Sequence, residues 1–358
     1  MRYALIGCGR VAPNHIKAAR ENGFEIVALC DTDEEAMKTL AENMKFSEKE
    51  YETVSFYTDF KQMLEKEKPE LVSIATPSGT HAEIALGVIN AGINCIAEKP
   101  IAMNIPDADA IIAAADEKGV KVAACHQNRF NKAVQEMRAA LEKGRFGKLS
   151  NAAVTVRWSR GEDYYSSAAW RGKWESDGGT LMNQCIHSID LLRWMCGDEI
   201  VSVTGITKRQ YHPYIEAEDV GTALIEFACG AVATVEGTVN LPGRDMEEQL
   251  TLIGETGAVK LGGTCANTIE YWHFSDNPDE DRDGFHEKTL NVYGNGHTSL
   301  FEDMALAIKE DRAPYVDARA GKRALETVLA IYKSSFSGKK VSLPLTDTGS
   351  TDFEGFFD

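Results

Sequence analysis

Several polar residues interrupt the apolar surface of one stretch, GGTLMNQCIHSIDLLRWMCG, at residues 178–197. Its apolar residues recur at helical spacing and predict one buried helix. Asn183 and His187 are four residues apart, so they share a face of that helix. A histidine beside an amide on a rigid apolar helix can move a proton to or from a bound substrate. The competing interpretation is a core histidine with structural hydrogen bonds.

A second pattern with chemical meaning lies near the N-terminus, between an apolar run at 3–6 and a helical pattern at 13–22. It is the GxGxx(G/A) sequence in the strand-turn-helix context of a dinucleotide-binding loop. Its first glycine permits a tight turn, its second lets the backbone approach a pyrophosphate, and the helix N-terminus offers N–H groups to phosphates. The loop residues are Gly7, Cys8, Gly9, Arg10, Val11 and Ala12.

An acidic residue follows the next apolar run at the spacing that this loop requires. The run 25–30 ends at Asp31, 22 residues after Gly9. A carboxylate there hydrogen-bonds the adenosine ribose and repels a 2′-phosphate, which favours NAD over NADP. Alternatively, Asp31 only caps the helix that starts near Asp33.

Apolar runs and helical patterns alternate through the first 125 residues, which indicates a doubly wound parallel sheet. The later runs are 54–57, 71–75, 93–97 and 120–125, separated by helical patterns at 60–66, 79–91 and 105–118. Ligands of such sheets bind beyond the carboxyl ends of the strands. Besides the glycine loop and Asp31, we therefore expect cofactor contacts from Thr76, Pro77, Ser78, His81, Glu98, Lys99 and Asn128.

Four segments together resemble the Gfo/Idh/MocA family of NAD(P)-dependent oxidoreductases, which act on sugars, inositols and nucleotide sugars. They are GCGRVA in the first loop, ATPSGTH at 75–81, AGINCIAEKP at 91–100 and GGTLMNQCIHSIDLL at 178–192. The resemblance implies an α/β Rossmann domain at 1–125. It also implies an α+β domain for substrate binding and oligomerisation at 126–345, built on a large open antiparallel sheet, with a tail at 346–358.

The resemblance also implies that Lys99 and His187 flank the reacting carbon and the nicotinamide. Oxidation of a secondary alcohol removes the hydroxyl proton while a hydride leaves the same carbon, so an imidazole base and a cation near the oxygen fit this chemistry. Many family members carry Asp where this chain has Asn183, which cannot ionise. We therefore expect His187 to act alone as the base, with Asp190 either orienting its ring or serving a structural role.

Alternating strand-like runs after residue 149 indicate an antiparallel sheet with the central helix inserted. They lie at 150–159, 200–209, 220–227, 231–239, 248–253 and 258–261. Between the first run and the helix, residues 157–179 interleave Arg and Lys with Trp and Tyr. Guanidinium groups bind carboxylates and phosphates, and aromatic faces stack on sugars or bases. A lid packed by its own tryptophans is the alternative.

The WRGKW-x3-GG-x3-NQ-x2-H arrangement is most similar to family members that oxidise nucleotide-linked N-acetyl-hexosaminuronates. That resemblance places Arg171, Asn183 and His187 at the sugar, with Lys99 opposite. Arg157 is a further candidate for substrate contact. His297, just before a helical pattern at 300–309, is either another anion ligand or part of a simple turn.

Composition narrows the possible partners. The formal net charge of −17 argues against nucleic acid. The sequence contains no apolar run long enough to span a bilayer and begins with a strand-like segment rather than a signal peptide, so we expect a cytoplasmic location. Eight cysteines without a CxxC pair indicate reduced core residues, and we expect no metal. The resemblance implies a homodimer or homotetramer formed through the C-terminal sheet.

These expectations lead to an NAD-dependent dehydrogenase that oxidises a secondary hydroxyl of a sugar or nucleotide sugar, with a UDP-N-acetyl-hexosaminuronate as one candidate substrate. An inositol or free-sugar dehydrogenase is the alternative within the same class. A non-catalytic, NAD-sensing regulatory protein is the alternative from another class, and an oxidoreductase that retains and recycles its NAD is a third.

Overall fold

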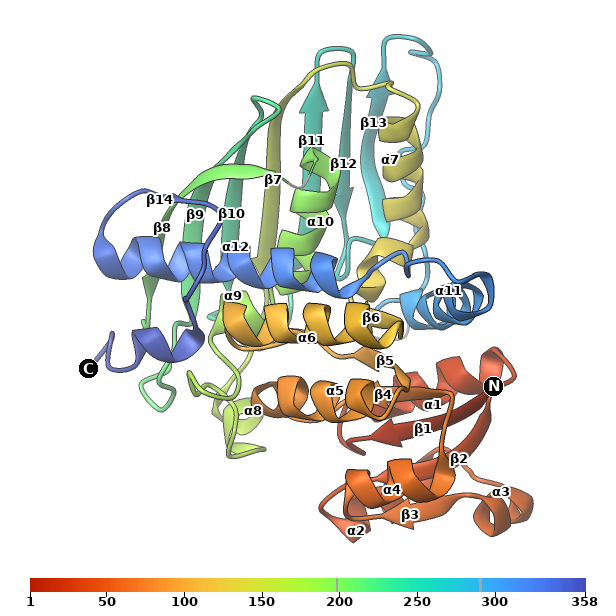
Figure 1. Cartoon of the computed structure of the whole chain (residues 1–358). Helices are drawn as coiled ribbons and strands as arrows, with labels where there is room; N and C mark the ends of the chain where they lie inside the picture. The colour runs from red at the N-terminus through yellow and green to blue at the C-terminus, as the bar shows by residue number, and fades with distance from the viewer. Residues whose placement is uncertain (198, 290–291) are drawn as a thin grey trace. The chain divides into compact units, whose positions relative to one another are not determined.

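The computed structural model describes residues 1–197, 199–289 and 292–358 (Figure 1). The chain divides into two compact units. Unit 1 comprises Met1–His126 and His297–Lys322, and unit 2 comprises Gln127–Gly296 and Arg323–Asp358. Unit 1 thus includes a late segment, 297–322, that the sequence analysis assigned to the second domain.

The sheet of unit 1 is parallel, as the alternating sequence pattern predicts. Its order is β3-β2-β1-β4-β5-β6, in which the order of the strands reverses between β1 and β4. The strands are nearly continuous apolar runs because helices cover a parallel sheet on both faces. Their bounds are β1 Arg2–Ile6, β2 Glu25–Cys30, β3 Ser55–Tyr57, β4 Leu71–Ile74, β5 Asn94–Ala97 and β6 Val122–Ala124.

The helices of unit 1 begin and end where the chain supplies caps. Asn104 accepts a hydrogen bond from the N–H of Asp107 to start α6, and Gly119 ends it with a φ of +67°. The late segment joins the sheet edge through an antiparallel bridge between Asp317 and Ala123. The helices are α1 Ala12–Glu21, α2 Glu34–Asn43, α3 Glu48–Thr53, α4 Phe60–Glu67, η1 Ser78–Thr80, α5 His81–Asn90, α6 Ile105–Lys118 and, across the unit boundary, α11 Gly296–Glu310.

The sheet of unit 2 has the order β13-β12-β11-β7-β10-β9-β8-β14. The sheet is mostly antiparallel, as expected, but β7 and β10 run parallel. No hairpin fixes their relative direction, since several helices and two strands separate them in the sequence. The strands are β7 Leu149–Arg157, β8 Ile200–Lys208, β9 Val220–Phe227, β10 Val232–Thr238, β11 Glu247–Gly254, β12 Gly257–Gly262, β13 Thr268–Phe274 and β14 Val341–Ser342.

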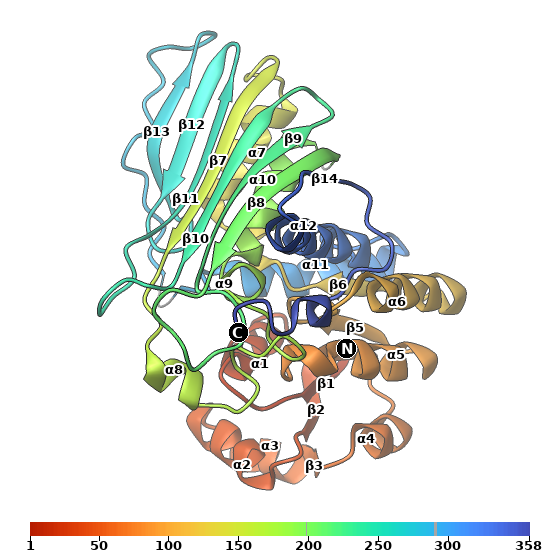
Figure 2. The same cartoon turned by 90° about the vertical axis from the view of Figure 1, so that its left-hand side faces the viewer.

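Helices cover one face of this sheet and leave the other open (Figure 2). They include α7 Lys132–Glu142, α10 Ile186–Cys196 and α12 Ala318–Ser337. Residues on the covered face of β8 and β9 are buried, whereas alternate residues such as Ile206 and Leu224 are 65% and 61% exposed. The open face therefore presents apolar side chains to its surroundings.

The stretch 178–197 forms two helices, so the expectation of one continuous helix is wrong. A short α9, Thr180–Asn183, precedes α10, and the carbonyl of Thr180 accepts hydrogen bonds from the N–H groups of both Gln184 and Cys185. The break lies against two glycines. Gly221 of β9 and Gly237 of β10 face each other across the strands, and a Cβ on Gly237 would lie 2.5 Å from the Sγ of Cys185.

The C-terminal tail packs against other parts of unit 2. The tail at 346–358 contains η3, Ser350–Phe353, and Phe353 is buried with its ring centroid 5.8 Å from that of Trp174 and 5.6 Å from that of Tyr332. The buried ring of Phe353 thus fixes the tail to the core of unit 2. None of the helices in the described ranges is both long and apolar enough to cross a bilayer.

Candidate active site

The glycine loop of unit 1 joins β1 to α1 and is fixed from both sides. Gly7 has a φ of +93°, and a Cβ there would lie 2.5 Å from the carbonyl of Ala75. On the other side, the N–H of Cys8 donates to Oδ2 of Asp31 at 2.7 Å. Only glycine satisfies both the backbone angle and the close approach at position 7.

A dinucleotide fits the geometry of this loop. A Cβ on Gly9 would meet no atom of the described chain within 4 Å, so the backbone is open to a ligand. Val11 stands at the N-cap of α1, and no side chain caps the helix there. The N–H groups of the first turn can therefore receive phosphate oxygens.

Asp31 and Asp33 have separate roles at the end of β2. Asp33 caps α2 by accepting from the N–H of Glu35 at 2.9 Å, so the capping role considered for Asp31 belongs to Asp33. Asp31 instead holds the N–H groups of Cys8 and Asp33, the latter at 3.0 Å. Its carboxylate thus lies beside the glycine loop, where the ribose interpretation requires it.

His81 connects two of the loops that follow the strands. Its ring is 1% exposed, with Nδ1 2.7 Å from the carbonyl oxygen of Pro100 and Nε2 2.8 Å from that of Thr76. Burial lowers the pKa of His81. His81 therefore joins the loop that contains Thr76 to the segment at Pro100. Pro77 and Ser78 lie in the same loop.

Lys99 lies two residues after the end of β5. The Lys99-Pro100 peptide is cis, and the N–H of Lys99 donates to Oε2 of Glu98 at 3.2 Å. Lys99 is partly exposed, whereas Glu98 is buried and its Oε1 lies 3.0 Å from Nε2 of His15. Glu98 thus contacts the core of unit 1 through His15.

His297 lies in unit 1, in the first turn of α11. It is 5% exposed, and its Nε2 is 3.9 Å from Oε1 of Glu98. The expected role of His297 as a substrate ligand is not supported by this burial. The side chain instead joins the core group around Glu98.

Unit 2 anchors the start of the central helices with two buried side chains. The N–H of Leu181 and the hydroxyl of Tyr332 both donate to Oε1 of Glu218, at 2.7 and 2.9 Å. The N–H groups of Gly179 and Met182 donate in turn to the Tyr332 oxygen. Burial raises the pKa of Glu218 to about 8. These contacts satisfy a helix N-terminus that has no access to water.

Asn183 and His187 lie on either side of the helix break. His187 is in the first turn of α10 and is 7% exposed, whereas Asn183 ends α9 and is partly exposed. The amide of Asn183 donates to Oδ1 of Asp177, a buried carboxylate whose Oδ2 accepts from the N–H of Gly172 at 2.7 Å. Sequence reasoning missed Asp177, whose only signal is its position just before the glycine pair 178–179.

Asp190 and Asn128 serve the interior of unit 2. Both oxygens of Asp190 accept from the guanidinium of Arg129, at 2.7 and 2.6 Å, and the pair is buried. The structural alternative for Asp190 is therefore supported. Asn128, expected at the cofactor, lies in η2 Gln127–Phe130 and donates to Oε1 of Glu248 at 3.2 Å.

The two candidate arginines differ in their partners. Arg157, at the end of β7, forms ion pairs with Glu236 at 2.8 Å and Glu247 at 2.5 Å, and these carboxylates raise its pKa. Its charge is thus already balanced within the sheet. The guanidinium of Arg171 lies 4.1 Å from the ring centroid of Tyr164, and among the described residues no carboxylate lies within ion-pair distance of it.

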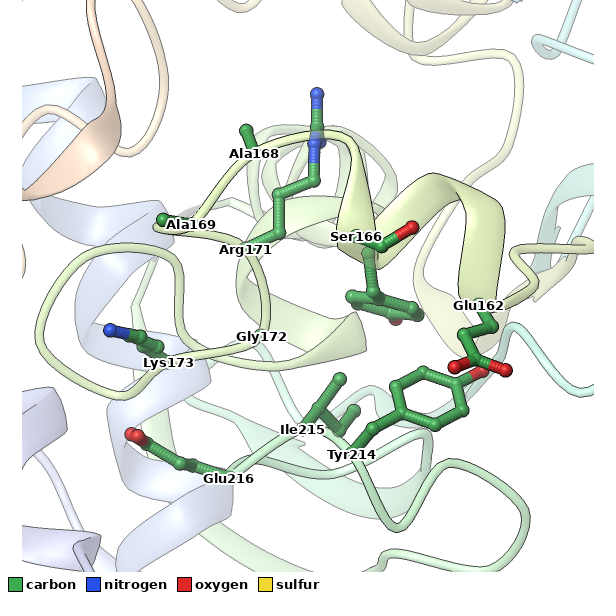
Figure 3. Close-up of a pocket in the computed structure, with 11 residues that line it drawn as sticks. Glu162, Ser166, Ala168, Ala169, Arg171, Gly172, Lys173, Tyr214, Ile215 and Glu216 are labelled. Carbon is green, nitrogen blue, oxygen red and sulfur yellow. The ribbon is translucent and has the colours of Figure 1, made fainter.

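The basic and aromatic segment contributes both to the core and to a pocket. Trp174 is buried against Tyr332, which supports the packed-lid interpretation for that residue. The pocket lies beside α8, Glu162–Ser166, and Figure 3 shows Arg171 and Lys173 on one stretch of its wall. Its other lining residues are Glu162, Tyr165, Ser166, Ala168, Ala169, Gly172, Tyr214, Ile215 and Glu216.

Two family models match this chain. The model described as the NAD-binding Rossmann fold of an oxidoreductase family matches residues 1–126, and the model of its C-terminal alpha/beta domain matches residues 138–343.

Solved structures resemble the chain over nearly its full length. The WlbA dehydrogenase of Bordetella pertussis, in complex with NADH and UDP-GlcNAcA, is 34% identical with a TM-score of 0.84, covering 97% of this chain and 99% of that one. The WlbA dehydrogenase of Chromobacterium violaceum, also with NADH and UDP-GlcNAcA, is 32% identical with a TM-score of 0.84, covering 97% and 96%.

A D-apiose dehydrogenase of Paraburkholderia graminis is 30% identical over 234 residues, which span 65% of this chain and 59% of that protein. Both halves of the chain match the same family, and the glycine loop, Asp31 and Lys99 follow strands β1, β2 and β5 of the parallel sheet. The protein belongs to the Gfo/Idh/MocA family of NAD(P)-dependent oxidoreductases.

Proposed function

We propose that the protein is an NAD-dependent dehydrogenase that oxidises a secondary hydroxyl of a UDP-linked N-acetyl-hexosaminuronate. The observation that carries this proposal is the likeness, over 97% of the chain, to WlbA dehydrogenases solved with NADH and UDP-GlcNAcA. The relatives' ligands contain a dinucleotide, a uronate carboxylate and a diphosphate. The chain offers the glycine loop for the dinucleotide and Arg171 for an anionic group of the substrate.

The preference for NAD over NADP rests on Asp31. Its carboxylate lies beside the glycine loop, where it accepts from the N–H of Cys8. A ribose with free hydroxyls can donate to such a carboxylate, whereas a 2′-phosphate would be repelled by it. The open backbone at Gly9 and the uncapped first turn of α1 suit the pyrophosphate.

The proposed chemistry uses His187 as the general base and Lys99 as the cation that stabilises the developing alkoxide. The imidazole accepts the hydroxyl proton while the carbon–oxygen double bond forms. NAD, when bound, supplies the acceptor for the hydride that leaves the same carbon. Asn183 cannot take up a proton, so the base acts without a carboxylate at that position.

Arg171 is the proposed ligand for a negatively charged part of the substrate. It lies on the wall of the pocket beside α8, with aromatic faces from Tyr164 and Trp170 against its guanidinium. A guanidinium with no carboxylate partner among the described residues can form two parallel hydrogen bonds to a uronate or a phosphate. Asn183, which is partly exposed at the end of α9, is a candidate to hydrogen-bond a hydroxyl group of the sugar.

A free-sugar or inositol dehydrogenase is the second candidate, favoured by the partial likeness to D-apiose dehydrogenase. The two candidates differ in the charge of the substrate. If Arg171 binds an anionic group, neutral sugars and inositols should be poor substrates.

The test is a comparison of NADH formation from UDP-N-acetyl-hexosaminuronates, their UDP-N-acetyl-hexosamine counterparts, free aldoses and inositols. We expect turnover only with the first group, and a large loss of that turnover in Arg171→Met. Equal rates with uncharged sugars would contradict the proposed substrate.

A protein that retains its cofactor needs a separate measurement. Mass spectrometry of the denatured, freshly purified protein detects retained NAD, and a second carbonyl substrate added to the assay would then restore turnover. NAD binding without any turnover under either condition would favour a regulatory protein and overturn the proposed reaction.

A further inference from the structure

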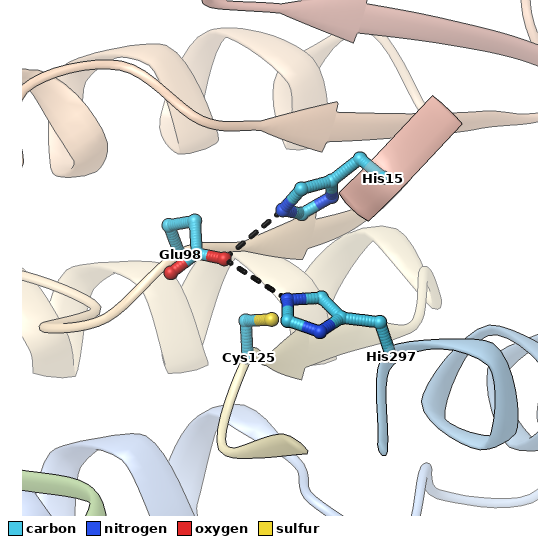
Figure 4. A group of neighbouring side chains, drawn as sticks. All are labelled: His15, Glu98, Cys125 and His297. Atoms are coloured by element: carbon cyan, nitrogen blue, oxygen red, sulfur yellow. Dashed lines mark hydrogen bonds and ion pairs between the residues drawn. The ribbon is translucent and has the colours of Figure 1, made fainter. Parts of the chain in front are cut away.

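Four side chains that bind metals in other proteins meet in the interior of unit 1 (Figure 4). His15 comes from α1, Glu98 follows β5, Cys125 follows β6, and His297 lies in the first turn of α11. All four are buried, with exposed fractions of 0 to 7%. Figure 4 shows their polar ends directed toward a common centre. We call these residues the buried cluster.

The distances in the buried cluster are close to those of a tetrahedral site. Nε2 of His15 lies 3.0 Å and Nε2 of His297 lies 3.9 Å from Oε1 of Glu98. One ligand atom from each residue, including Sγ of Cys125, lies within 4.8 Å of all the others. Around Zn²⁺, neighbouring N, O and S donors are about 3.3 to 3.7 Å apart, so the widest pair would need to close by about 1 Å.

We propose that the buried cluster binds one Zn²⁺ ion. Two imidazoles, one thiolate and one carboxylate form a mixed set that suits zinc better than magnesium or calcium, which prefer oxygen ligands alone. All four positions would be filled by protein, as in structural zinc sites. The site therefore has no open position for substrate.

Binding also balances the charge of this interior. When Zn²⁺ enters, the Cys125 sulfur–hydrogen bond breaks, the proton leaves to solvent, and a sulfur–zinc bond forms. The two positive charges of zinc then equal the negative charges of one carboxylate and one thiolate.

The site would have a defined structural effect. His297 belongs to the late segment 297–322, whereas the other three ligands lie within the first 126 residues. A metal held by all four would fasten the first turn of α11 to the ends of β5 and β6. Because its ligands are widely separated in the sequence, the site cannot be predicted from a short sequence motif.

The experiment measures metal content and cobalt spectra of the full-length protein. Wild type, Cys125→Ser and Cys95→Ser are purified, stripped with a chelator and titrated with Zn²⁺ or Co²⁺ alone. Cys95 is a matched control, since it is a fully buried cysteine of β5 outside the cluster. Wild type and Cys95→Ser should bind one metal per chain and show a thiolate-to-cobalt charge-transfer band.

Cys125→Ser should lose that band and bind metal more than about 100-fold more weakly. Mutation of a residue that only hydrogen-bonds a metal ligand already lowers metal affinity roughly 10- to 100-fold, and Cys125 is itself a proposed ligand. If Cys125→Ser does not fold, His297→Gln should keep the band and weaken cobalt binding. Wild type that binds no metal would overturn the proposal. An unchanged band in Cys125→Ser, or an equal loss in Cys95→Ser, would also overturn it.

Discussion

The carboxylate of Asp31 accepts a hydrogen bond from the N–H of Cys8 at 2.7 Å, which fixes the end of β2 against the glycine loop. The other oxygen of Asp31 accepts from the N–H of Asp33 at 3.0 Å. The two bonds hold the carboxylate in place before any ligand arrives. A ribose that donates to it therefore finds an oriented acceptor.

Asp31→Asn should weaken NAD binding and relax the discrimination against NADP. The change removes a charged acceptor worth about 1.5 to 3 kcal/mol, so NAD affinity should fall roughly 10- to 100-fold while NADP affinity rises or holds. Titration calorimetry measures both. Asp33→Asn is the control because it removes a nearby carboxylate that caps α2. Unchanged NAD affinity in Asp31→Asn would argue against the ribose contact.

Gly237→Ala should disturb the break between α9 and α10. The added Cβ would lie 2.5 Å from Sγ of Cys185 and 2.9 Å from Cδ2 of Leu181. Overpacking of this kind costs about 1 to 3 kcal/mol, and it should also lower turnover because His187 follows Cys185 by two residues. Urea unfolding and the NADH assay measure the two effects.

A second substitution separates this steric effect from a general loss of folding. Cys185→Ala in the same chain removes the nearest clashing atom and should restore part of both stability and turnover. A Gly237→Ala protein with wild-type stability and rate would contradict the role assigned to the paired glycines.

Glu218 should make unit 2 less stable as the pH rises. Its pKa of about 8 in the folded state lies above the ordinary value of 4.5, so the folded protein binds a proton that the unfolded chain releases. This contribution is fully present below about pH 4.5 and is lost as the pH approaches about 8. Glu218→Gln should therefore flatten the pH dependence by up to about 1.4 kcal/mol per pH unit.

Tryptophan fluorescence during urea unfolding measures this slope, because all five tryptophans lie in unit 2. Glu175→Gln, a change at an exposed glutamate of the same unit, is the control. If wild type and Glu218→Gln have the same slope, the carboxyl does not retain its proton in the folded state.

We expect a second copy of the chain to cover the open face of the unit 2 sheet. Ile206 and Leu224 are more than half exposed on that face, and exposed apolar patches on a sheet commonly mark an interface. Light scattering should give the mass of two or four chains for the wild type and of one chain for Ile206→Glu combined with Leu224→Glu. Tyr51→Glu, at an exposed aromatic of α3, should leave the mass unchanged. A monomeric wild type would refute this expectation.

The parallel sheet of unit 1 could be predicted because its signals are local. The apolar runs, the glycine loop and the helix caps each lie within a few neighbouring residues. The same holds for Asp31, whose distance from Gly9 along the chain reflects one strand-helix-strand repeat.

The features that the sequence did not reveal depend on contacts between distant residues. The helix break at Gln184 and Cys185 follows from glycines on two later strands, Gly221 and Gly237. Arg157 appears available in the sequence, but two strands bring Glu236 and Glu247 to its guanidinium. Helical or strand periodicity carries no information about such pairings.

The proposed roles of Lys99 and His187 can be tested by the rate of NADH formation with the preferred UDP-linked substrate. The proteins to compare are wild type, Lys99→Met and His187→Ala. Loss of a positioned general acid, base or charge typically costs 10²- to 10⁴-fold, so we predict that turnover falls at least about 100-fold in each variant. NAD affinity, measured in parallel, should remain close to that of the wild type in His187→Ala. Wild-type turnover in either variant would contradict the proposed roles of Lys99 and His187.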